Sequence, residues 1–134
     1  MRLLKTTLFS LFLLSGYCTF SQNIATVNKY DSLYKACLTH GKDLEQCSEK
    51  YYTRMDSMLN VVYKALLARY DKKGKATLKS EQADWIINRD TYFDKAAKED
   101  SAMSDAGDKQ MDIADKKAGY VRKRVLILLN RLTY

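Results

Sequence analysis

The sequence predicts an all-α fold: an antiparallel helical hairpin, a third long C-terminal helix, and a short N-terminal helix tethered by a disulfide. The 134 residues contain no proline and five glycines, and apolar residues recur at intervals of three and four over long stretches. Proline and glycine are the residues that most often interrupt helices, so we expect long helices with short connections. A chain of this length forms one domain with room for a buried core.

Residues 1–21 have the layout of an export signal. Two basic residues precede the apolar run 8–14, and small residues stand before a predicted cleavage at Gln22. The apolar run is too short to span a membrane. We therefore expect a signal peptide at 1–21 and a single domain at 22–134, located in the periplasm or outside the cell.

Three cysteines bear on this compartment. Cys18 would be the lipidated residue of a lipoprotein, but Tyr17 places a bulky side chain where a small one is required, which argues against a lipid anchor. The mature chain keeps Cys37 and Cys47. Export favours an oxidising compartment, where these two would form a disulfide; two free thiols are the alternative.

Two helices are expected before the centre of the chain. Apolar positions at helical spacing predict a short helix from Val27 to Cys37, which Gly41 ends. Asp43 is a suitable N-cap for a long helix, and that helix continues to Tyr70.

A turn at 71–76 is expected to reverse the chain near Gly74 and to lead into a helix capped by Thr77. Residues equally far from Gly74 then lie side by side in the hairpin. This places Tyr63 near Trp85, and Asn60 near Arg89 and Asp90.

After a loop at 101–108, the last helix is expected from Asp108 to Leu132. Its apolar residues recur at intervals of three and four residues and form a seam that packs on another helix: Met111, Ala114, Ala118, Val121, Val125, Leu128 and Leu132. The partner helix belongs either to the same chain or to a second copy in a homo-oligomer. Basic residues that include Arg122, Lys123 and Arg124 are expected opposite this seam. They form either a solvated outer face or a surface for membranes and acidic polymers.

Uncommon residues recur in a set order across the hairpin. An acidic residue, Leu-Asn and Tyr precede the turn, and Leu, Gln, Trp and an Arg-Asp pair follow it: Asp56, Leu59, Asn60, Tyr63, Leu78, Gln82, Trp85, Arg89 and Asp90. In this pattern the chain resembles the secreted bacterial family of lysozyme-inhibitor LprI-like domains. The polar and aromatic members are either structural, fixing the register of two packed helices, or a recognition surface for a protein partner.

The chain departs from the pattern of that family at two positions. Many members carry a cysteine just after the Arg-Asp pair and another in the C-terminal helix, near the places that Phe93 and Ala114 occupy here. The absence of both implies that hydrophobic packing replaces a second bridge.

The resemblance implies an exported binding protein that inhibits lysozyme. Many lysozymes are strongly basic, and the mature chain has 21 basic and 16 acidic residues, a formal charge of +5. Inhibition would then need a local acidic patch. Two groups of residues offer one: Asp43, Glu45 and Glu49, or Asp94, Glu99 and Asp100. The alternative is an envelope adaptor that binds anionic wall or membrane components through its basic C-terminal helix.

No group or motif of residues in the sequence predicts catalysis or a cofactor. The single histidine, His40, lies in a glycine-containing turn without a nucleophile signature. There is no phosphate-binding glycine loop or zinc pattern, and the aspartates of the 101–108 loop lack the spacing of a calcium loop. The expected export and the lack of a nucleic-acid-binding motif argue against nucleic acid as a partner.

Overall fold

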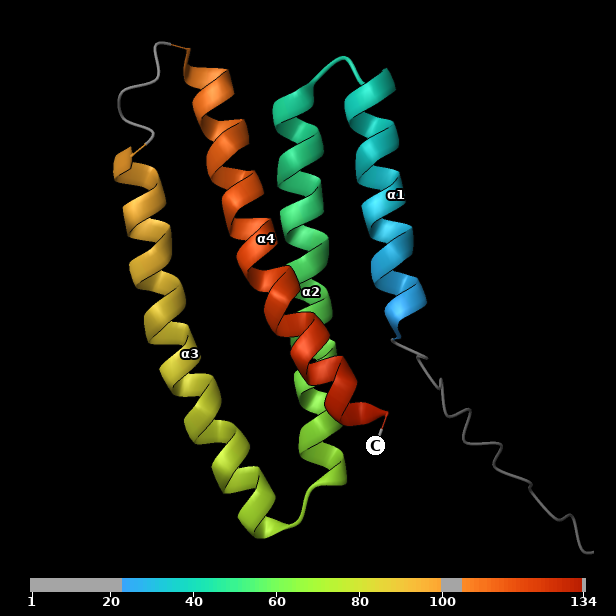
Figure 1. Cartoon of the computed structure of the whole chain (residues 1–134), viewed down its shortest axis with the longest axis vertical. Helices are drawn as coiled ribbons and strands as arrows, with labels where there is room; N and C mark the ends of the chain where they lie inside the picture. Colours follow the sequence, from blue (N-terminus) through green and yellow to red (C-terminus); the bar gives the residue numbers. More distant parts are fainter. Residues whose placement is uncertain (1–22, 100–104, 134) are drawn as a thin grey trace, which may run out of the picture.

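The computed structural model describes residues 23–99 and 105–133, which form four α-helices and no strand (Figure 1). They are α1 (Ile24–His40), α2 (Leu44–Arg69), α3 (Lys72–Glu99) and α4 (Ala106–Leu132). The all-α prediction is confirmed. The predicted signal peptide, Cys18 and residues 101–104 of the predicted loop lie outside the described residues, and the end of that loop is already part of α4.

The core lies mainly between α2 and α4, which run in the same direction along most of their length (Figure 1). Fully buried side chains alternate along both helices at helical spacing: Met55, Val62 and Leu66 from α2, and Ala118, Val121, Val125 and Leu128 from α4. The seam predicted on the last helix therefore closes within one chain. That closure removes the exposed apolar stripe that was the reason to expect a homo-oligomer.

The hairpin of α2 and α3 is antiparallel, and α3 leans away from α2 with distance from the turn (Figure 1). Leu78 and Ala96 are buried on α3, near its two ends. Contacts between α3 and the rest of the bundle are made more with α4 than with α2. Side chains of α4 therefore fill the space that opens between α2 and α3.

The turn of the hairpin lies at Tyr70 and Asp71, so the predicted reversal at Gly74 is wrong. Asp71 caps α3 by accepting the backbone amide of Gly74 at 2.8 Å. Gly74 belongs to the first turn of the helix, where a Cβ would approach the side chains of Asp71 and Tyr70 at 3.1 Å. The glycine is explained by this crowding around the cap rather than by a change of chain direction.

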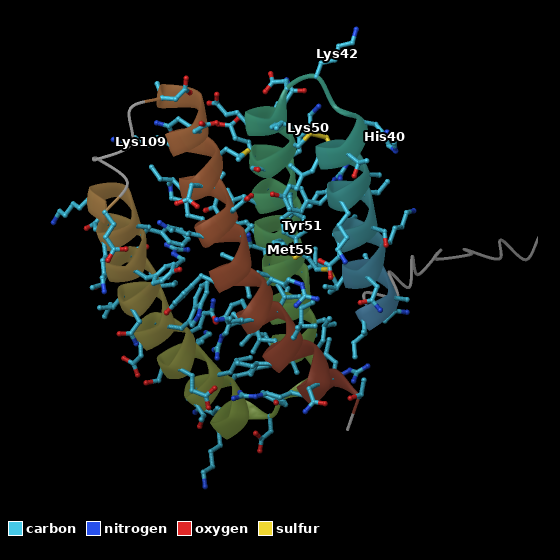
Figure 2. The ribbon with its side chains drawn as sticks, turned by 45° about the horizontal axis from the view of Figure 1, so that its top comes forward. His40, Lys42, Lys50, Tyr51, Met55 and Lys109 are labelled. Carbon is cyan, nitrogen blue, oxygen red and sulfur yellow. A yellow bond between two sulfur atoms is a disulfide. The ribbon has the colours of Figure 1, made fainter. Side chains whose placement is uncertain are left out.

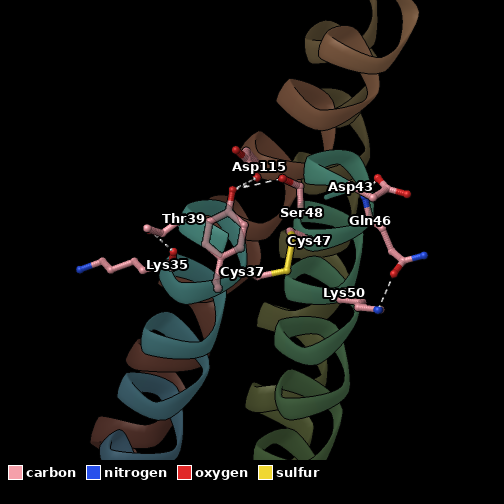
Figure 3. Close-up of a disulfide and its surroundings, with 10 residues drawn as sticks. Lys35, Cys37, Thr39, Asp43, Gln46, Cys47, Ser48, Lys50 and Asp115 are labelled. Carbon is pink, nitrogen blue, oxygen red and sulfur yellow. Dashed lines mark hydrogen bonds between the residues drawn. A yellow bond between two sulfur atoms is a disulfide. The ribbon is translucent and has the colours of Figure 1, made fainter. Parts of the chain in front are cut away.

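The first helix is longer than predicted, because Asn23 caps it through the amide of Thr26 and it continues to His40. The predicted disulfide between Cys37 and Cys47 is present, with 5.8 Å between the Cα atoms, and it fastens the end of α1 to the start of α2 (Figure 3). Gly41 ends α1 with an ordinary extended backbone, φ −74°.

Candidate functional site

The residues predicted to form one seam across the hairpin do not form one hydrogen-bonded cluster, although the charges of Asp56, Arg89 and Asp90 all act on Tyr52. On α2, the side-chain amide of Asn60 donates to the carbonyl oxygen of Asp56 at 3.1 Å, within its own helix. On α3, Arg89 donates to the neighbouring Asp90 from Nε and Nη2, at 2.9 and 2.7 Å. The predicted contact of Asn60 with Arg89 and Asp90 is absent from these hydrogen bonds. The shifted turn explains this, because it displaces the pairing of the two helices by about two helical turns.

The other members of the predicted seam lie in or beside the core. Leu59 and Gln82 are buried, and Tyr63 and Trp85 pack partly buried against the core. The ring of Trp85 stacks on Tyr120 of α4, with 5.8 Å between centroids. The sequence did not single out Tyr120, which lies on a helix outside the predicted hairpin.

Aromatic rings and cations fill the space between α2, α3 and α4. Phe93 makes edge contacts with Tyr52 of α2 and Tyr120 of α4, at centroid distances of 6.0 and 6.2 Å. Arg89 lies over the Phe93 ring at 5.7 Å, and Lys117 lies over it at 5.2 Å. The position near which many family members carry a cysteine thus anchors an aromatic cluster.

The predicted basic face of the last helix is not one surface. Arg122 binds Asp31 of α1 at 2.6 Å, Lys123 is exposed, and Arg124 is buried beside Gln82 of α3. Successive residues of a helix point in directions about 100° apart, so three consecutive cations do not share a face. The expectation of a continuous basic face at these positions is therefore wrong.

A groove of about 370 Å³ lies between α3 and α4. We call it the α3–α4 groove, and its lining combines aromatic rings with cations: Trp85, Tyr92, Asp115, Lys116, Gly119, Tyr120, Lys123, Arg124 and Ile127. The ring of Tyr92 stacks on Tyr120, with 4.6 Å between centroids. The spacing of the α4 residues, in steps of three and four, is the sequence signal that marks this face.

Two polar clusters hold α1 against the bundle. In the first, the hydroxyl of Tyr34 donates to Asp115 of α4 at 2.5 Å and lies 3.1 Å from the hydroxyl of buried Ser48 (Figure 3). A phenol has one proton, so Ser48 is the donor in the second bond. Burial, reinforced by the hydrogen bond to Asp115, raises the pKa of Tyr34 to about 12.

In the second cluster, Asp31 of α1 accepts hydrogen bonds from Tyr51 at 2.5 Å and from Nε and Nη2 of Arg122. Burial alone would raise the pKa of Asp31, but the bonds from Arg122 and Tyr51 outweigh it and lower that pKa overall. The rings of Tyr34 and Tyr51 stack at 4.4 Å and join the two clusters. This network was not predicted, because its partners are up to 91 residues apart.

Carboxylates gather at the end of the molecule where α2 and α4 begin, and we call this surface the acidic end. Asp43 and Asp105 cap the two helices, and Glu45 and Asp108 follow in their first turns. A depression of about 400 Å³ lies among them, lined by Lys42, Asp43, Leu44, Glu45, Asp105, Gly107, Asp108 and Met111. Lys42 points away from the helices at this end (Figure 2). Asp43 and Glu45 belong to one of the two acidic patches that the sequence offered.

The second acidic patch is interleaved with lysines. Asp94 and Glu99 border a shallow surface together with Lys95 and Lys98, and Glu99 pairs with Lys95 at 3.6 Å. Asp100 lies outside the described residues. This surface is mixed in charge, whereas the acidic end has four carboxylates and one lysine among its lining residues.

Among the described residues, no group of histidine, cysteine and acidic side chains is arranged to hold a metal ion. Within the same ranges, no helix has the length and apolar character needed to cross a membrane.

The fold defines a class: a small helical protein whose first helix is tethered by a disulfide. The profile of the family described as "Lysozyme inhibitor LprI" matches residues 35–126, which include α2, α3 and most of α4. The match covers more than half of the chain, and the protein belongs to this family. No curated protein and no solved structure matches the chain.

Proposed function

We propose that the protein is an exported inhibitor that binds lysozyme through its acidic end. Membership of the family supports inhibition by protein–protein binding. The observation that carries the choice of surface is the cluster of Asp43, Glu45, Asp105 and Asp108 on a chain whose overall charge is positive. A basic enzyme is repelled by the chain as a whole, so close contact requires a local surface of opposite charge.

The geometry of the acidic end supports this use. Asp43 and Asp105 accept backbone amides of the helices that they cap, so their carboxylates are held in place before a partner arrives. Leu44 lines the same depression and is 42% exposed, which adds an apolar contact to the surface. A fixed charged surface loses little conformational entropy on binding.

Export is part of the same proposal. Its support is the signal-like layout of residues 1–21 and the Cys37–Cys47 disulfide, a bond that persists in oxidising compartments such as the periplasm and the extracellular space. A lysozyme inhibitor placed there would meet the enzyme before it reaches the cell wall.

The test is the rate at which a basic lysozyme degrades cell-wall substrate, with and without an excess of the mature, oxidised protein. We expect dose-dependent inhibition that weakens in the double variant Glu45→Gln/Asp108→Asn. The two capping aspartates are left intact so that the helices keep their caps. Two surface carboxylates of this kind contribute about 1–2 kcal/mol together, which corresponds to an inhibition constant about five- to thirty-fold higher.

The matched control is Asp84→Lys. It changes the net charge by the same two units at an exposed position on α3 that belongs to neither acidic patch. Equal weakening in the double variant and in this control would show that net charge, and not this surface, determines binding. Unchanged lysozyme rates with the wild-type protein at low and at physiological salt would refute the proposed function itself.

A further inference from the structure

The α3–α4 groove is bordered by a buried cation, Arg124, which makes no direct ion pair among the described residues. The nearby carboxylate of Glu81 acts on its charge but binds Arg131 at 2.6 Å. Arg124 is 8% exposed, and its Nε donates to the neutral side chain of Gln82 at 3.1 Å. Its Nη2 is buried and has no hydrogen-bond partner among the described residues. Burial, together with the positive charge of Arg131, lowers the pKa of Arg124. An arginine in this environment is missing the planar acceptor that it normally pairs with.

A structural role does not account for this arrangement. Removing a charge from water is unfavourable unless the geometry supplies an ionic partner, and an apolar residue of similar volume usually serves a core position better. The guanidinium lies 5.9 Å from the ring of Trp85, which offsets the desolvation only in part. The unsatisfied donor group therefore points to a ligand with a negatively charged acceptor.

Gly119 is a second, independent indication that the α3–α4 groove is a ligand site. It lies in the interior of α4, where glycine is less favourable than alanine, and a Cβ added to it would meet no atom within 4 Å. Neither packing nor backbone conformation thus explains the glycine. It lines the α3–α4 groove, and its missing side chain keeps that groove open.

The size and lining of the groove indicate the kind of ligand. Its volume of about 370 Å³ lies in the range of small-molecule sites, and stacked rings with a few polar groups are the usual lining of such sites. Lys123 adds positive charge on the same face of α4, whereas Lys116 is paired with Asp112 at 2.7 Å. Asp115 also borders the groove, and its carboxylate already accepts a hydrogen bond from Tyr34.

We propose that the α3–α4 groove binds a small organic carboxylate, whose body lies against Trp85 and Tyr120 and whose carboxylate pairs with Arg124. The ligand is an aromatic acid or an acidic sugar, since both combine a carboxylate with a flat or apolar face. This site is separate from the acidic end, so it stands whether or not the protein inhibits lysozyme.

Trp85 is the only tryptophan of the chain, so its fluorescence reports directly on the groove. The experiment titrates the mature, oxidised protein with two pairs of probes: phenylacetate against phenylacetamide, and N-acetylmuramate against N-acetylglucosamine. Each pair contrasts a carboxylate with a neutral compound of similar shape. We expect saturable changes with at least one carboxylate, and binding at least about tenfold weaker for its neutral counterpart. The pair that responds distinguishes an aromatic acid from an acidic sugar.

Two variants test the site by different means. Arg124→Met removes the cation and keeps the volume, and Gly119→Leu fills the groove while leaving Arg124 in place. We expect Arg124→Met to weaken carboxylate binding at least about tenfold in a protein that still folds, although Gln82 loses its hydrogen-bond donor. We expect Gly119→Leu to abolish binding in a folded protein. Lys79→Met, at an exposed position on α3, is the control for loss of one positive charge and should leave binding unchanged within about twofold.

Three results would overturn the proposal. The first is the absence of any carboxylate response in the folded wild-type protein, and the second is equal binding of the neutral counterparts. The third is unchanged binding in folded Gly119→Leu, which tests the location of the site even if Arg124→Met does not fold.

Discussion

Opening the Cys37–Cys47 disulfide should lower the free energy of unfolding by about 2.7 kcal/mol. The two cysteines are 10 residues apart in the sequence, and the loop-closure relation gives about 2.7 kcal/mol for a loop of that length at 25 °C. For a domain of this size, the corresponding fall in melting temperature is about 10 °C. The change acts on the unfolded chain, so the folded structure should keep its helices.

The folded state survives reduction because α1 has other attachments. Val27 is fully buried in the core, Tyr34 is hydrogen-bonded to α4, and Asp31 is paired with Arg122. Far-ultraviolet circular dichroism at room temperature should therefore be the same in the oxidised and reduced protein. The unfolding midpoint in urea should be lower after reduction, with little change in the slope of the transition.

The assay is urea unfolding of a chain that begins at Gln22, with and without a thiol reductant. Such a chain contains only Cys37 and Cys47, so the reductant acts on one bond. The double variant Cys37→Ala/Cys47→Ala is the control for the reductant itself. An unchanged midpoint would refute the loop-closure reasoning, and a loss of helical signal on reduction would show that the other attachments do not hold α1.

Two further predictions concern the same region. Replacing Asp31 by Asn should cost about 1–2 kcal/mol near neutral pH, a value reduced from that of a fully buried charged pair because both partners are partly exposed. The fold lowers the pKa of Asp31 below 3.8, so this stabilisation is complete above about pH 4 and is lost as the pH falls through the lowered value. Urea unfolding at several pH values should then show the difference between the variant and the wild type shrinking below about pH 4; a constant difference would contradict the pairing. Replacing Gly41 by Ala should cost about 1–3 kcal/mol, because the new Cβ would collide with the carbonyl oxygen of Cys37 and lie 3.0 Å from the Cys47 sulfur. Gly119→Ala is its control in thermal unfolding: its Cβ meets no atom, and it should be stabilising by up to about 1 kcal/mol.

Local patterns in the sequence were sufficient to predict the helices and the seam of α4. Val121, Val125 and Leu128 recur at the period of a helix and could be placed on one buried face without knowledge of their partner. The disulfide was also predictable, because the expected signal peptide would remove Cys18 and the two remaining cysteines can form only one pair. These features depend on residues close together in the sequence.

The turn was harder to place, because Asp71 and Gly74 are both common in turns and lie three residues apart. Asp71 acts as a helix cap, which moves the reversal of the chain toward the N-terminus. When the turn is misplaced by a few residues, the predicted pairing of residues on the two helices is wrong by twice that number. For this reason the sequence predicted Tyr63 beside Trp85, whereas the structure stacks Trp85 on Tyr120.

The pairing of Arg124 with Gln82 was beyond any local pattern, because the two residues are 42 positions apart and lie on different helices. In the sequence, Arg124 belongs to a run of three basic residues, and such a run usually marks a solvated surface. Only the tertiary structure separates the three cations into an ion pair, an exposed lysine and a buried arginine.

The divergence of α3 from α2 connects the fold to the α3–α4 groove. Two helices that separate from a common turn leave a space that widens along their length, and small side chains cannot fill it without cavities. Here Phe93 and Tyr52 fill the side toward α2, together with the ring of Tyr120 from α4. Tyr120 also lines the α3–α4 groove, together with Gly119 and Arg124. The ring that closes the splayed hairpin with Phe93 and Tyr52 therefore also forms part of the wall of the groove.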